Sequence, residues 1–484
     1  MLRTLPILVV LAVPLATAAA ATTEVTPADD LEAAVNALGP GDELIVHGGT
    51  YTLTSRFSFA LAGTAAAPIV IRAADGEVPV IDRPTADQNI WDLERADYVT
   101  IRGLTFRGGS AGLRISAADH LTIEDCEIRD TGDVALRAND VGVTYTHLLI
   151  RHNHIHDTGG TGEGMYLGCN DDGCRLADSV IERNHVHHTN GPTVTQGDGI
   201  EIKEGSSGNV VRDNIIHDTG YPCILTYSAA GHGPANVIER NAMWGCGDHA
   251  IQAAADAIIR NNLILGSAAN GIAMQPHQAG APQNLVVVHN TIIHPTHDAI
   301  RASGIVGAVV IANNALYAQA GNAVNVGGDT SQLVVVGNRG VGTVTGAAGG
   351  FTGSTLAGDL VSGGYAGAPP MDLFPAVGST LIGAGDPAYA VADDWNGTPR
   401  GGTVDVGAYA FAATGNPGWQ LAADFKQFPG GVVPGDDGGG GDGDAGTTGA
   451  TPASGCCQTG GRPARASLVL ALLVVVVVVR RRRA

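Results

Sequence analysis

Apolar residues alternate with polar residues in short phrases that recur along most of the chain. From about residue 99 to residue 340, a phrase with the pattern I/V-x-x-N returns at spacings of about 21 to 31 residues. Alternation with a period of two is typical of β-strands, and a repeat of this length is that of one coil of a solenoid. The asparagines of the phrase form one column: Asn153, Asn184, Asn214, Asn241, Asn262, Asn290, Asn314 and Asn338.

A second phrase follows in each coil, a small residue and then apolar-x-apolar, as in GMYL, GIEI and GIAM. Turn-forming sequences such as HDTG separate the two phrases, so each coil contains two short strands joined by corners. The Ile, Leu and Val side chains of these strands point inward and stack on those of the next coil, about 4.8 Å away. The sequence therefore predicts an all-β protein, a right-handed parallel β-helix over residues 22–411, with the asparagine column as an internal amide ladder.

The N-terminal part of this region supplies a cap for the exposed edge of the first coil. A short amphipathic helix from about Pro27 to Leu38, then a turn and a strand, is predicted by TPADDLEAAVNALGPGDELIVHGGTY. This stretch, with GTAAAPIVIRAADGEVPVI after it, resembles the opening of chondroitinase B, of the alginate lyases related to it and of other members of the pectin-lyase-like superfamily. The resemblance implies a β-helix over roughly residues 24–411 that meets an extracellular polysaccharide.

Both ends of the chain carry sequences that are typical of export. Residues 1–21 combine an arginine, an apolar run and an alanine-rich stretch, so we expect a signal peptide. Residues 412–465 are rich in Gly and Asp and are expected to form a flexible spacer. Residues 466–484, an apolar run and an arginine cluster, follow Cys456 and Cys457, and this arrangement resembles the MYXO-CTERM class of bacterial sorting tails. The resemblance implies a secreted protein anchored at the outer membrane on the cell surface, with membrane contact only through this tail.

The charge of the chain limits the classes of molecule that it can bind. The formal net charge is −20 at pH 7, which excludes nucleic acid as a general partner because binding to phosphate backbones depends on basic patches. An extracellular acidic polysaccharide would need a local cationic site or a bridging metal on such a surface. We expect the protein to be a monomer.

Outside the cytosol, Cys169 and Cys174 are expected to form a disulfide, and Cys223 with Cys246 is a second candidate pair.

Placing the second phrases in register aligns outward residues from successive coils. The turn position just before the small residue holds Glu163, Asp198 and His249 in the middle coils, and Lys203 and Tyr227 lie two positions beyond the row. One face therefore gathers carboxylates, tyrosines and cations within about four coils. The row itself is Arg114, Arg137, Tyr166, Glu201, Leu225, Gln252, Ala273, Arg301 and Asn325.

This face contains the residue types that a polysaccharide lyase requires. Lyase cleavage of a uronate-containing polymer needs a positive charge or Ca²⁺ to neutralise the carboxylate, and a base to take the C5 proton. Glu163 and Asp198, in successive coils, should repel each other unless they share a proton or a hard cation, and Glu201 could complete an all-oxygen site. We therefore predict that these three residues bind Ca²⁺, the only cofactor expected.

The remaining roles go to neighbouring side chains. Lys203 is the predicted base and Arg137 the neutralising charge, with Tyr227 as a further catalytic candidate. Because Lys203 follows the inward-facing Ile202, it should point outward and be exposed, so Lys203→Ala should change stability by less than about 0.5 kcal/mol. The predicted contacts to the substrate are Arg114, Tyr166, His249, Gln252 and Arg301.

Other interpretations of these residues stay open. The charges could be ordinary solvated surface groups, and the protein could be a non-catalytic glycan-binding or adhesion module. The segment GDGIEIKEGSSGN also resembles a strand of polygalacturonases that carries paired aspartates, but only Asp198 matches and Gly197 replaces the second, so glycoside hydrolysis is less favoured than lyase chemistry. A histidine column of His156, His187 and His217 is predicted to be a surface stack, with a Zn²⁺ site as the alternative.

Overall fold

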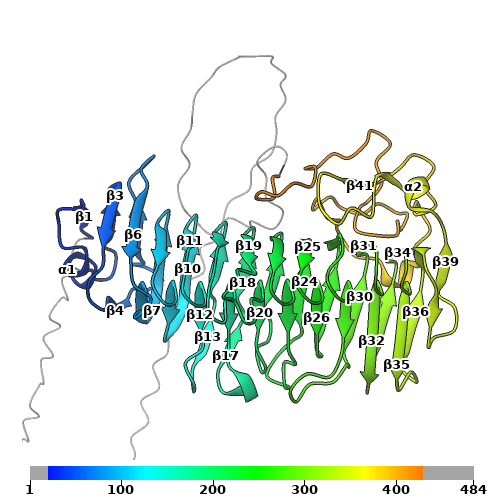
Figure 1. The fold of residues 1–484 in the computed structure, drawn as a ribbon, viewed down its shortest axis with the longest axis horizontal. Coiled ribbons are helices and arrows are strands. Elements are labelled where there is room, and N and C mark those ends of the chain that lie inside the picture. The colour runs from blue at the N-terminus through cyan, green and yellow to red at the C-terminus, as the bar shows by residue number, and fades with distance from the viewer. Residues whose placement is uncertain (1–19, 429–484) are drawn as a thin grey trace, which may run out of the picture. The chain divides into compact units, whose positions relative to one another are not determined.

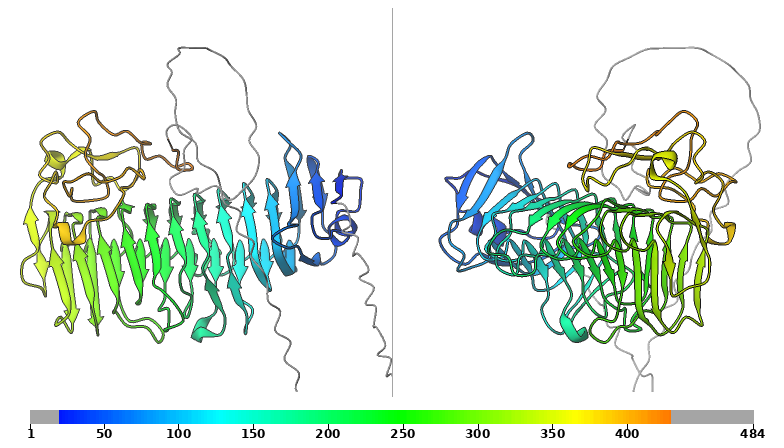
Figure 2. Two further views of the ribbon diagram at one scale, coloured as in Figure 1. Left: turned by 180° about the vertical axis from the view of Figure 1, so that it is seen from behind. Right: turned by 45° about the vertical axis from the view of Figure 1, so that its right-hand side comes forward.

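The strands wind into a solenoid, as a computed structural model that describes residues 20–428 shows (Figure 1). They form a 26-stranded sheet, a 13-stranded sheet and a two-stranded antiparallel sheet. The coils follow one another along the axis in chain order, as the view from behind also shows (Figure 2). The predicted fold class, an all-β parallel β-helix with very few helices, is confirmed.

The strands of the two large parallel sheets fall into three groups. The 13-stranded sheet contains β3 (Gly49–Thr52), β6 (Pro79–Arg83), β8 (Thr105–Gly108), β11 (Glu127–Arg129), β15 (His154–His156), β19 (His185–Thr189), β22 (Ile215–Thr219), β25 (Ala242–Cys246), β28 (Leu263–Ile264), β31 (Thr291–His294), β34 (Ala315–Ala318), β37 (Asn338–Val341) and β39 (Phe351–Gly353). The second phrases of the coils form β9 (Leu113–Ile115), β12 (Leu136–Ala138), β16 (Met165–Leu167), β20 (Ile200–Ile202), β23 (Ile224–Thr226), β26 (Ile251–Ala253), β29 (Ile272–Met274), β32 (Ile300–Ile305), β35 (Val324–Gly328) and β38 (Val344–Thr345). The other strands of the 26-stranded sheet are β1 (Thr22–Val25), β2 (Glu43–Val46), β4 (Ser58–Ala62), β5 (Ile69–Ala73), β7 (Trp91–Arg102), β10 (Ala118–Glu124), β13 (Thr144–Thr146), β14 (Leu149–Arg151), β17 (Arg175–Ala177), β18 (Val180–Glu182), β21 (Val210–Arg212), β24 (Asn236–Glu239), β27 (Ala257–Arg260), β30 (Leu285–Val288), β33 (Val309–Ala312) and β36 (Leu333–Val336).

A short helix lies beside the first coils, as predicted. The helix α1 (Leu31–Asn36) is shorter than the expected span of residues 27–38, because the Asp30 side chain caps it by accepting a hydrogen bond from the Ala33 amide at 2.9 Å. Its Leu31 and Val35 are buried, so the apolar face of the helix packs on the end of the solenoid.

The predicted asparagine ladder is confirmed. Nδ2 of Asn214 donates to Oδ1 of Asn241 at 2.9 Å, and the backbone amide of Asn214 donates to the same oxygen at 3.0 Å. The same pair of bonds links each asparagine of the column to the next, from Asn153 to Asn338. The ladder satisfies buried polar groups at one corner of each coil from Asn153 to Asn338, which keeps these coils in register.

A C-terminal segment packs on the outside of the 13-stranded sheet. The helix α2 (Leu356–Asp359), the antiparallel pair β40 (Leu360–Ser362) and β41 (Asp372–Pro375), and loops after them lie over β31 and β34 (Figure 1). Two single-turn 3₁₀ helices complete the described elements: η1 (Asn170–Asp172) and η2 (Pro387–Tyr389).

The expected spacer overlaps this C-terminal segment. We expected residues 412–465 to be a flexible spacer, but within its described start, residues 412–428, Leu421 and Lys426 are buried. Lys426 Nζ lies 2.7 Å from Oδ1 of Asp213 on the β-helix, so the folded region extends beyond residue 411. The rest of the spacer lies outside the described residues.

The two ends of the chain fall almost wholly outside the described residues. This holds for the expected signal peptide, apart from residues 20 and 21, and for the expected tail, residues 466–484. Within residues 20–428, no helix combines the length and the apolar character needed to cross a bilayer.

The expected pair and the second candidate pair both form disulfides. Cys169 is bonded to Cys174, and Cys223 is bonded to Cys246. The first bond closes the loop that contains η1, and the second joins the corners of two neighbouring coils. Among the described cysteines, Cys126 is free and buried.

Candidate functional site

The outward row predicted from the sequence is a row of the 26-stranded sheet. The register pairs Tyr166 with Arg137 on one side and with Glu201 on the other, and it pairs Glu201 with Leu225. The remaining pairs extend the row in both directions without a break, from Arg114 to Asn325. Parallel, in-register stacking therefore places residues from distant parts of the sequence on one face.

Three carboxylates meet in the middle of this face. Glu163 and Asp198 precede β16 and β20 at the same turn, and Glu201 is the central residue of β20. Oxygen atoms of the three lie within 4.8 Å of one another, and each residue is only 1% exposed. We call this cluster the acidic trio.

The acidic trio is short of hydrogen-bond donors. Oδ1 of Asp198 and Oε2 of Glu201 are buried and have no hydrogen-bond partner among the described residues. Burial, together with the charges of Glu201 and Glu163, raises the pKa of Asp198 well above its usual range. Burial also raises the pKa of Glu201, against the opposing effect of Lys203. The trio therefore needs protons or a cation to offset its charge.

The carboxylate oxygens of the acidic trio suit a hard cation. Ca²⁺ prefers carboxylate oxygens, and buried oxygens without partners are positions that a cation can occupy. Glu163 is oriented by the Thr161 hydroxyl, which donates to its Oε2 at 2.6 Å. The acidic trio thus fits the predicted Ca²⁺ ligands in residue type, in proximity and in unfilled hydrogen-bonding capacity.

Lys203 lies against the acidic trio. Its ammonium donates to Oε1 of Glu201 and to the Tyr227 hydroxyl, the latter at 3.2 Å, and the Tyr227 hydroxyl donates to the same Glu201 oxygen at 3.1 Å. The Nζ atom is 4.4 Å from the ring centroid of Tyr166 and 4.8 Å from that of Tyr227. Burial disfavours the charged form of Lys203, but the Glu201 carboxylate outweighs this effect and raises the pKa of Lys203.

The expectation that Lys203 is exposed is wrong. Strand alternation does turn the side chain outward, but Lys203 is only 4% exposed. The rings of Tyr166 and Tyr227 from the two neighbouring coils flank it, and the ring of His277 stacks on Tyr227 with a centroid distance of 4.7 Å. A truncation at Lys203 would therefore leave a buried carboxylate without its ion pair.

Arg137 is on the same row but does not contact the acidic trio. Nη1 of Arg137 is 3.9 Å from Oδ2 of Asp133, and Nη2 donates to Oδ1 of Asn89 at 3.5 Å. Its side chain is 27% exposed, so it can reach a ligand that lies along the row. The structure places Arg137 two strands from Glu201, with Tyr166 between them.

The predicted substrate contacts are spread along the solenoid. Tyr166 is at the acidic trio, whereas Arg114 is held in an ion pair with Asp140 at 2.6 Å. Gln252 accepts a hydrogen bond from Gln275 at 3.1 Å, one coil beyond Leu225.

The other two predicted contacts also lie beyond the coil of Leu225, His249 in the same coil as Gln252. His249 is buried, and its Nδ1 accepts a hydrogen bond from the Asn270 amide at 3.0 Å. Arg301 is exposed and lies four strands from Glu201 along the row. The structure therefore joins Tyr166 to the acidic trio and leaves the other four at a distance from it.

A loop that the sequence did not single out completes the site. His277 Nε2 is 3.0 Å from the Tyr227 hydroxyl, and Gln278 Nε2 donates to Oδ1 of Asn170 at 2.9 Å. The amide of Asp171 donates to Oε1 of Gln278 at 3.2 Å. These contacts join residues as far as 108 positions apart, and no local sequence pattern marks them.

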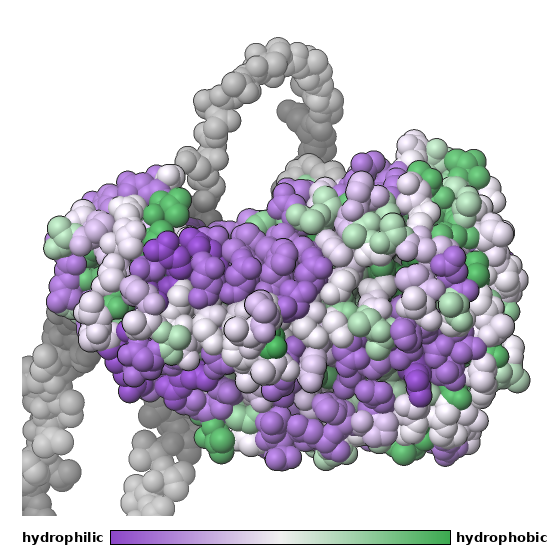
Figure 3. All heavy atoms as spheres, in the orientation of Figure 1, coloured by the Kyte–Doolittle hydropathy of each residue, from purple (hydrophilic) through white to green (hydrophobic). Residues whose placement is uncertain are grey.

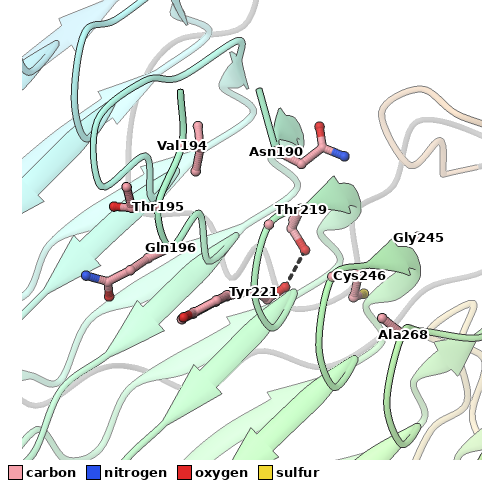
Figure 4. Close-up of a pocket in the computed structure, with 11 residues that line it drawn as sticks. Asn190, Val194, Thr195, Gln196, Thr219, Tyr221, Gly245, Cys246 and Ala268 are labelled. Carbon is pink, nitrogen blue, oxygen red and sulfur yellow. Dashed lines mark hydrogen bonds between the residues drawn. The ribbon is translucent and has the colours of Figure 1, made fainter. Parts of the chain in front are cut away.

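A cavity of about 590 Å³ opens beside the loop that leads to Asp198 (Figure 4). Val194, Thr195 and Gln196 of this loop line one side, and Tyr221 and Cys246 of the next coils line another. The acidic trio is not part of the lining, so the cavity is a separate polar space next to it along the solenoid.

The cavity has the residue types of a sugar-binding surface. Tyr221 is 45% exposed, and the Thr219 hydroxyl donates to the Tyr221 carbonyl at 2.7 Å, which fixes the turn that carries the ring. An exposed aromatic ring can pack on the apolar face of a sugar. Amide and hydroxyl side chains beside it, here those of Gln196 and Thr195, can form hydrogen bonds with the hydroxyl groups of the sugar.

Comparisons with known proteins show a sequence similarity over part of the chain and similar solved structures. Over 129 residues the chain is 30% identical to pectate lyase PEL9 of Emericella nidulans, and the match covers 26% of this chain and 29% of that protein. The chain thus matches less than a third of the length of this relative. The crystal structure of pectate lyase Pel9A is 14% identical with a TM-score of 0.47, covering 82% of this chain and 97% of that one.

A further solved structure, XylC in complex with xylose, is 10% identical with a TM-score of 0.54, covering 81% of this chain and 99% of that one. This likeness supports the β-helix fold alone. Residues 12–258, just over half of the chain, match a family model described as Pel9A-like, right handed beta helix region. Because the matched residues make up more than half of the chain, the chain belongs to the Pel9A-like family of right-handed β-helix proteins, within the pectin-lyase-like fold.

Proposed function

We propose that this protein acts on an acidic, uronate-containing polysaccharide as a Ca²⁺-assisted lyase. Membership of the Pel9A-like family and the identity to a protein named pectate lyase support a polysaccharide as the ligand. The observation that carries the proposal is the acidic trio, in which two buried carboxylate oxygens lack partners beside a lysine.

Glu163, Asp198 and Glu201 would hold the cation. Bound Ca²⁺ would supply positive charge that neutralises a uronate carboxylate and makes the neighbouring C5 proton more acidic. Arg137 and the exposed Tyr221 would bind other parts of the polymer, because Arg137 lies on the outward row and Tyr221 lines the cavity beside the loop that leads to Asp198.

Lys203 is the proposed base, and its protonation state decides whether it can act. In the ion pair with Glu201 its pKa is raised, so the amine is charged and cannot accept a proton. Lys203 would lose this partner when Glu201 takes part in cation binding, and the nearby positive charge would lower its pKa. We therefore expect base catalysis to depend on Ca²⁺ and not on Lys203 alone.

The test is an absorbance screen for unsaturated uronate ends on polygalacturonate, alginate and chondroitin, with Ca²⁺ or with EDTA. We expect product with Ca²⁺ and none with EDTA, and a loss of about 100- to 10,000-fold in rate for Glu201→Gln and for Lys203→Met. The exposed carboxylate variant Asp329→Asn is the matched control and should keep the wild-type rate. Equal rates in Ca²⁺ and in EDTA would contradict the role of the acidic trio.

A second candidate is a non-catalytic glycan-binding module, and one observation favours it. Lys203 is buried and engaged by both Glu201 and Tyr227, which suits a structural ion pair better than a free base. Binding to acidic glycans on an array, without product in the absorbance screen, would support this second candidate and reject the lyase.

We further propose that residues 1–21 direct secretion, that residues 466–484 anchor the protein at the cell surface, and that it is a monomer. The apolar run, the cysteine pair and the arginine cluster in the sequence support the first two proposals. N-terminal sequencing of the mature protein, membrane fractionation and size-exclusion chromatography test them in turn.

A further inference from the structure

A grid of histidines covers the outer face of the 13-stranded sheet, on a different sheet from the acidic trio. His154 pairs with His185, and His156 pairs with His187, which in turn pairs with His217. Ring centroids of paired histidines are 5.0 to 5.1 Å apart with interplanar angles of 6° to 11°. The predicted column of stacked rings is therefore present, and a second, shorter column stands beside it.

Ring nitrogens converge between the two columns. Nε2 of His154 is 2.8 Å from Nε2 of His187, and each of His154, His185 and His187 offers a nitrogen within 4.8 Å of the other two. In a tetrahedral zinc site with bonds of about 2.0 to 2.1 Å, two ligand nitrogens lie about 3.3 Å apart. The separation of 2.8 Å is shorter than this spacing and the limit of 4.8 Å is longer, so the side chains would have to rotate for all three nitrogens to reach one ion.

Burial at His185 and His187 favours the neutral imidazole, which is the form that binds metal. Burial and then the neighbouring histidines lower the pKa of His185 to about 3 and that of His187 to about 2. Neutral imidazole offers a lone pair without a competing proton at pH 7. Carboxylates hold the histidines next to the proposed ligands: Asp218 Oδ2 is 2.7 Å from His217 Nδ1, and Glu127 Oε1 is 3.3 Å from His156 Nε2.

Aromatic rings border the grid on two sides. Phe425 of the C-terminal segment lies with its ring centroid 5.7 Å from that of His185 and 6.0 Å from that of His154. Trp244 stacks on His217 at 4.6 Å and ends the longer column. His185 is only 7% exposed, so a bound ion would be partly shielded from water.

The wider surface around the grid is polar. Figure 3 shows hydrophilic residues gathered over the region where Figure 1 labels β11 and β19. An ion in solution can therefore approach across a hydrophilic surface.

We propose that His154, His185 and His187 form a binding site for one transition-metal ion of the Zn²⁺ class, with its fourth position open to water or to an external ligand. Imidazole nitrogens select Zn²⁺, Cu²⁺ or Ni²⁺ over Ca²⁺, whereas the all-oxygen acidic trio has the opposite preference. Three histidines and an open position are also the ligand set of several zinc enzymes. The site is independent of the proposed lyase function.

The experiment uses untagged, EDTA-stripped protein, because a polyhistidine tag would itself bind the probe. Zn²⁺ titration by calorimetry and metal analysis after dialysis should give one Zn²⁺ per chain. His185→Asn and His187→Asn should weaken Zn²⁺ binding by more than about 100-fold, since removal of outer-shell partners alone costs 10- to 100-fold. Co²⁺ in place of Zn²⁺ should give visible absorption bands typical of tetrahedral nitrogen ligation.

Two controls separate this site from the rest of the protein. His232→Asn removes an exposed histidine outside the grid, and Glu201→Gln removes a ligand of the acidic trio. Both should bind Zn²⁺ as tightly as the wild type, and excess Ca²⁺ should not compete.

Folding of each variant is checked by thermal melting in EDTA. If His187→Asn does not fold, the partly exposed His154→Asn replaces it, with the same expected loss. Wild-type protein that binds no Zn²⁺ at millimolar concentration, or folded variants that bind it as well as the wild type, would overturn the proposal and leave the grid as a stack of rings.

Discussion

The ammonium of Lys203 donates a hydrogen bond to Oε1 of Glu201, two residues earlier along the chain, and both side chains are buried. The two therefore form one charged unit at the centre of the acidic trio. Because the trio holds three carboxylates and Lys203 is the cation that contacts it in the described structure, we expect this ion pair to affect both the stability of the coil and the chemistry available there.

Removal of Lys203 should destabilise the protein. Lys203→Met leaves Glu201 buried without its ion pair, and breaking a buried pair from one side costs about 3–5 kcal/mol. The double variant Lys203→Met/Glu201→Gln removes both charges and should recover most of the loss. Urea denaturation in EDTA measures the free energy of unfolding of the single and the double variant. A single variant as stable as the wild type would show that the pair is not a stabilising unit.

The pH dependence of the stability of the metal-free protein should arise in part from Asp198. The pKa of Asp198 is raised in the folded state. The contribution of this carboxyl group to stability is therefore fully present below its pKa in the unfolded chain, about 3.9, and is lost as pH rises through its pKa in the folded protein. Compared with Asp198→Asn, the wild type in EDTA should therefore lose thermal stability as pH rises above about 4. Ca²⁺ should reverse this loss in the wild type. Parallel melting curves for the two proteins at every pH would contradict the raised pKa.

A gap in the asparagine ladder should be costly. Asn241→Ala removes the acceptor of the Asn214 amide and the donor to the Val211 carbonyl, which are bonded at 3.0 and 2.9 Å. Each buried polar group left without a partner costs about 1–3 kcal/mol, so we expect the loss of these two bonds to lower the free energy of unfolding by at least about 2 kcal/mol. The exposed Asn36→Ala in helix α1 is the control and should change stability by less than about 0.5 kcal/mol. Equal unfolding free energies for the two variants would exclude a stabilising ladder.

Lys426 should hold the C-terminal segment on the β-helix. Its Nζ lies 2.7 Å from Oδ1 of Asp213, 2.6 Å from the Trp395 carbonyl oxygen and 3.5 Å from the centroid of the Trp395 ring. Lys426→Met should lower the free energy of unfolding by about 3 kcal/mol. This is the low end of the range for a broken buried ion pair, because Arg240 still pairs with Asp213 at 3.2 Å.

Limited proteolysis provides the measurement for this segment. Cleavage within residues 412–428 should become faster in Lys426→Met, while the neighbouring exposed variant Gln427→Ala should be cut at the wild-type rate. Unchanged cleavage of Lys426→Met would mean that apolar contacts such as that of Leu421 hold the segment without the ion pair.

The sequence by itself determined the coil repeat, the asparagine ladder and the outward row from Arg114 to Asn325. These features follow from strand alternation and from parallel stacking in register, which are rules about neighbouring positions and repeating phrases. The acidic trio also followed from them, because Glu163 and Asp198 occupy the same turn of successive coils and Glu201 occupies the strand after it.

Only the tertiary structure decided what covers each outward side chain. Lys203 points outward as predicted, but Tyr227 from the next coil and His277 from a loop 50 residues beyond Tyr227 close over it, so an apparently exposed lysine is a buried ion pair. Lys426 pairs with Asp213 across 213 residues, and the histidine nitrogens converge diagonally between two columns. Burial depends on side chains brought from distant positions, and alternation within one strand carries no information about them.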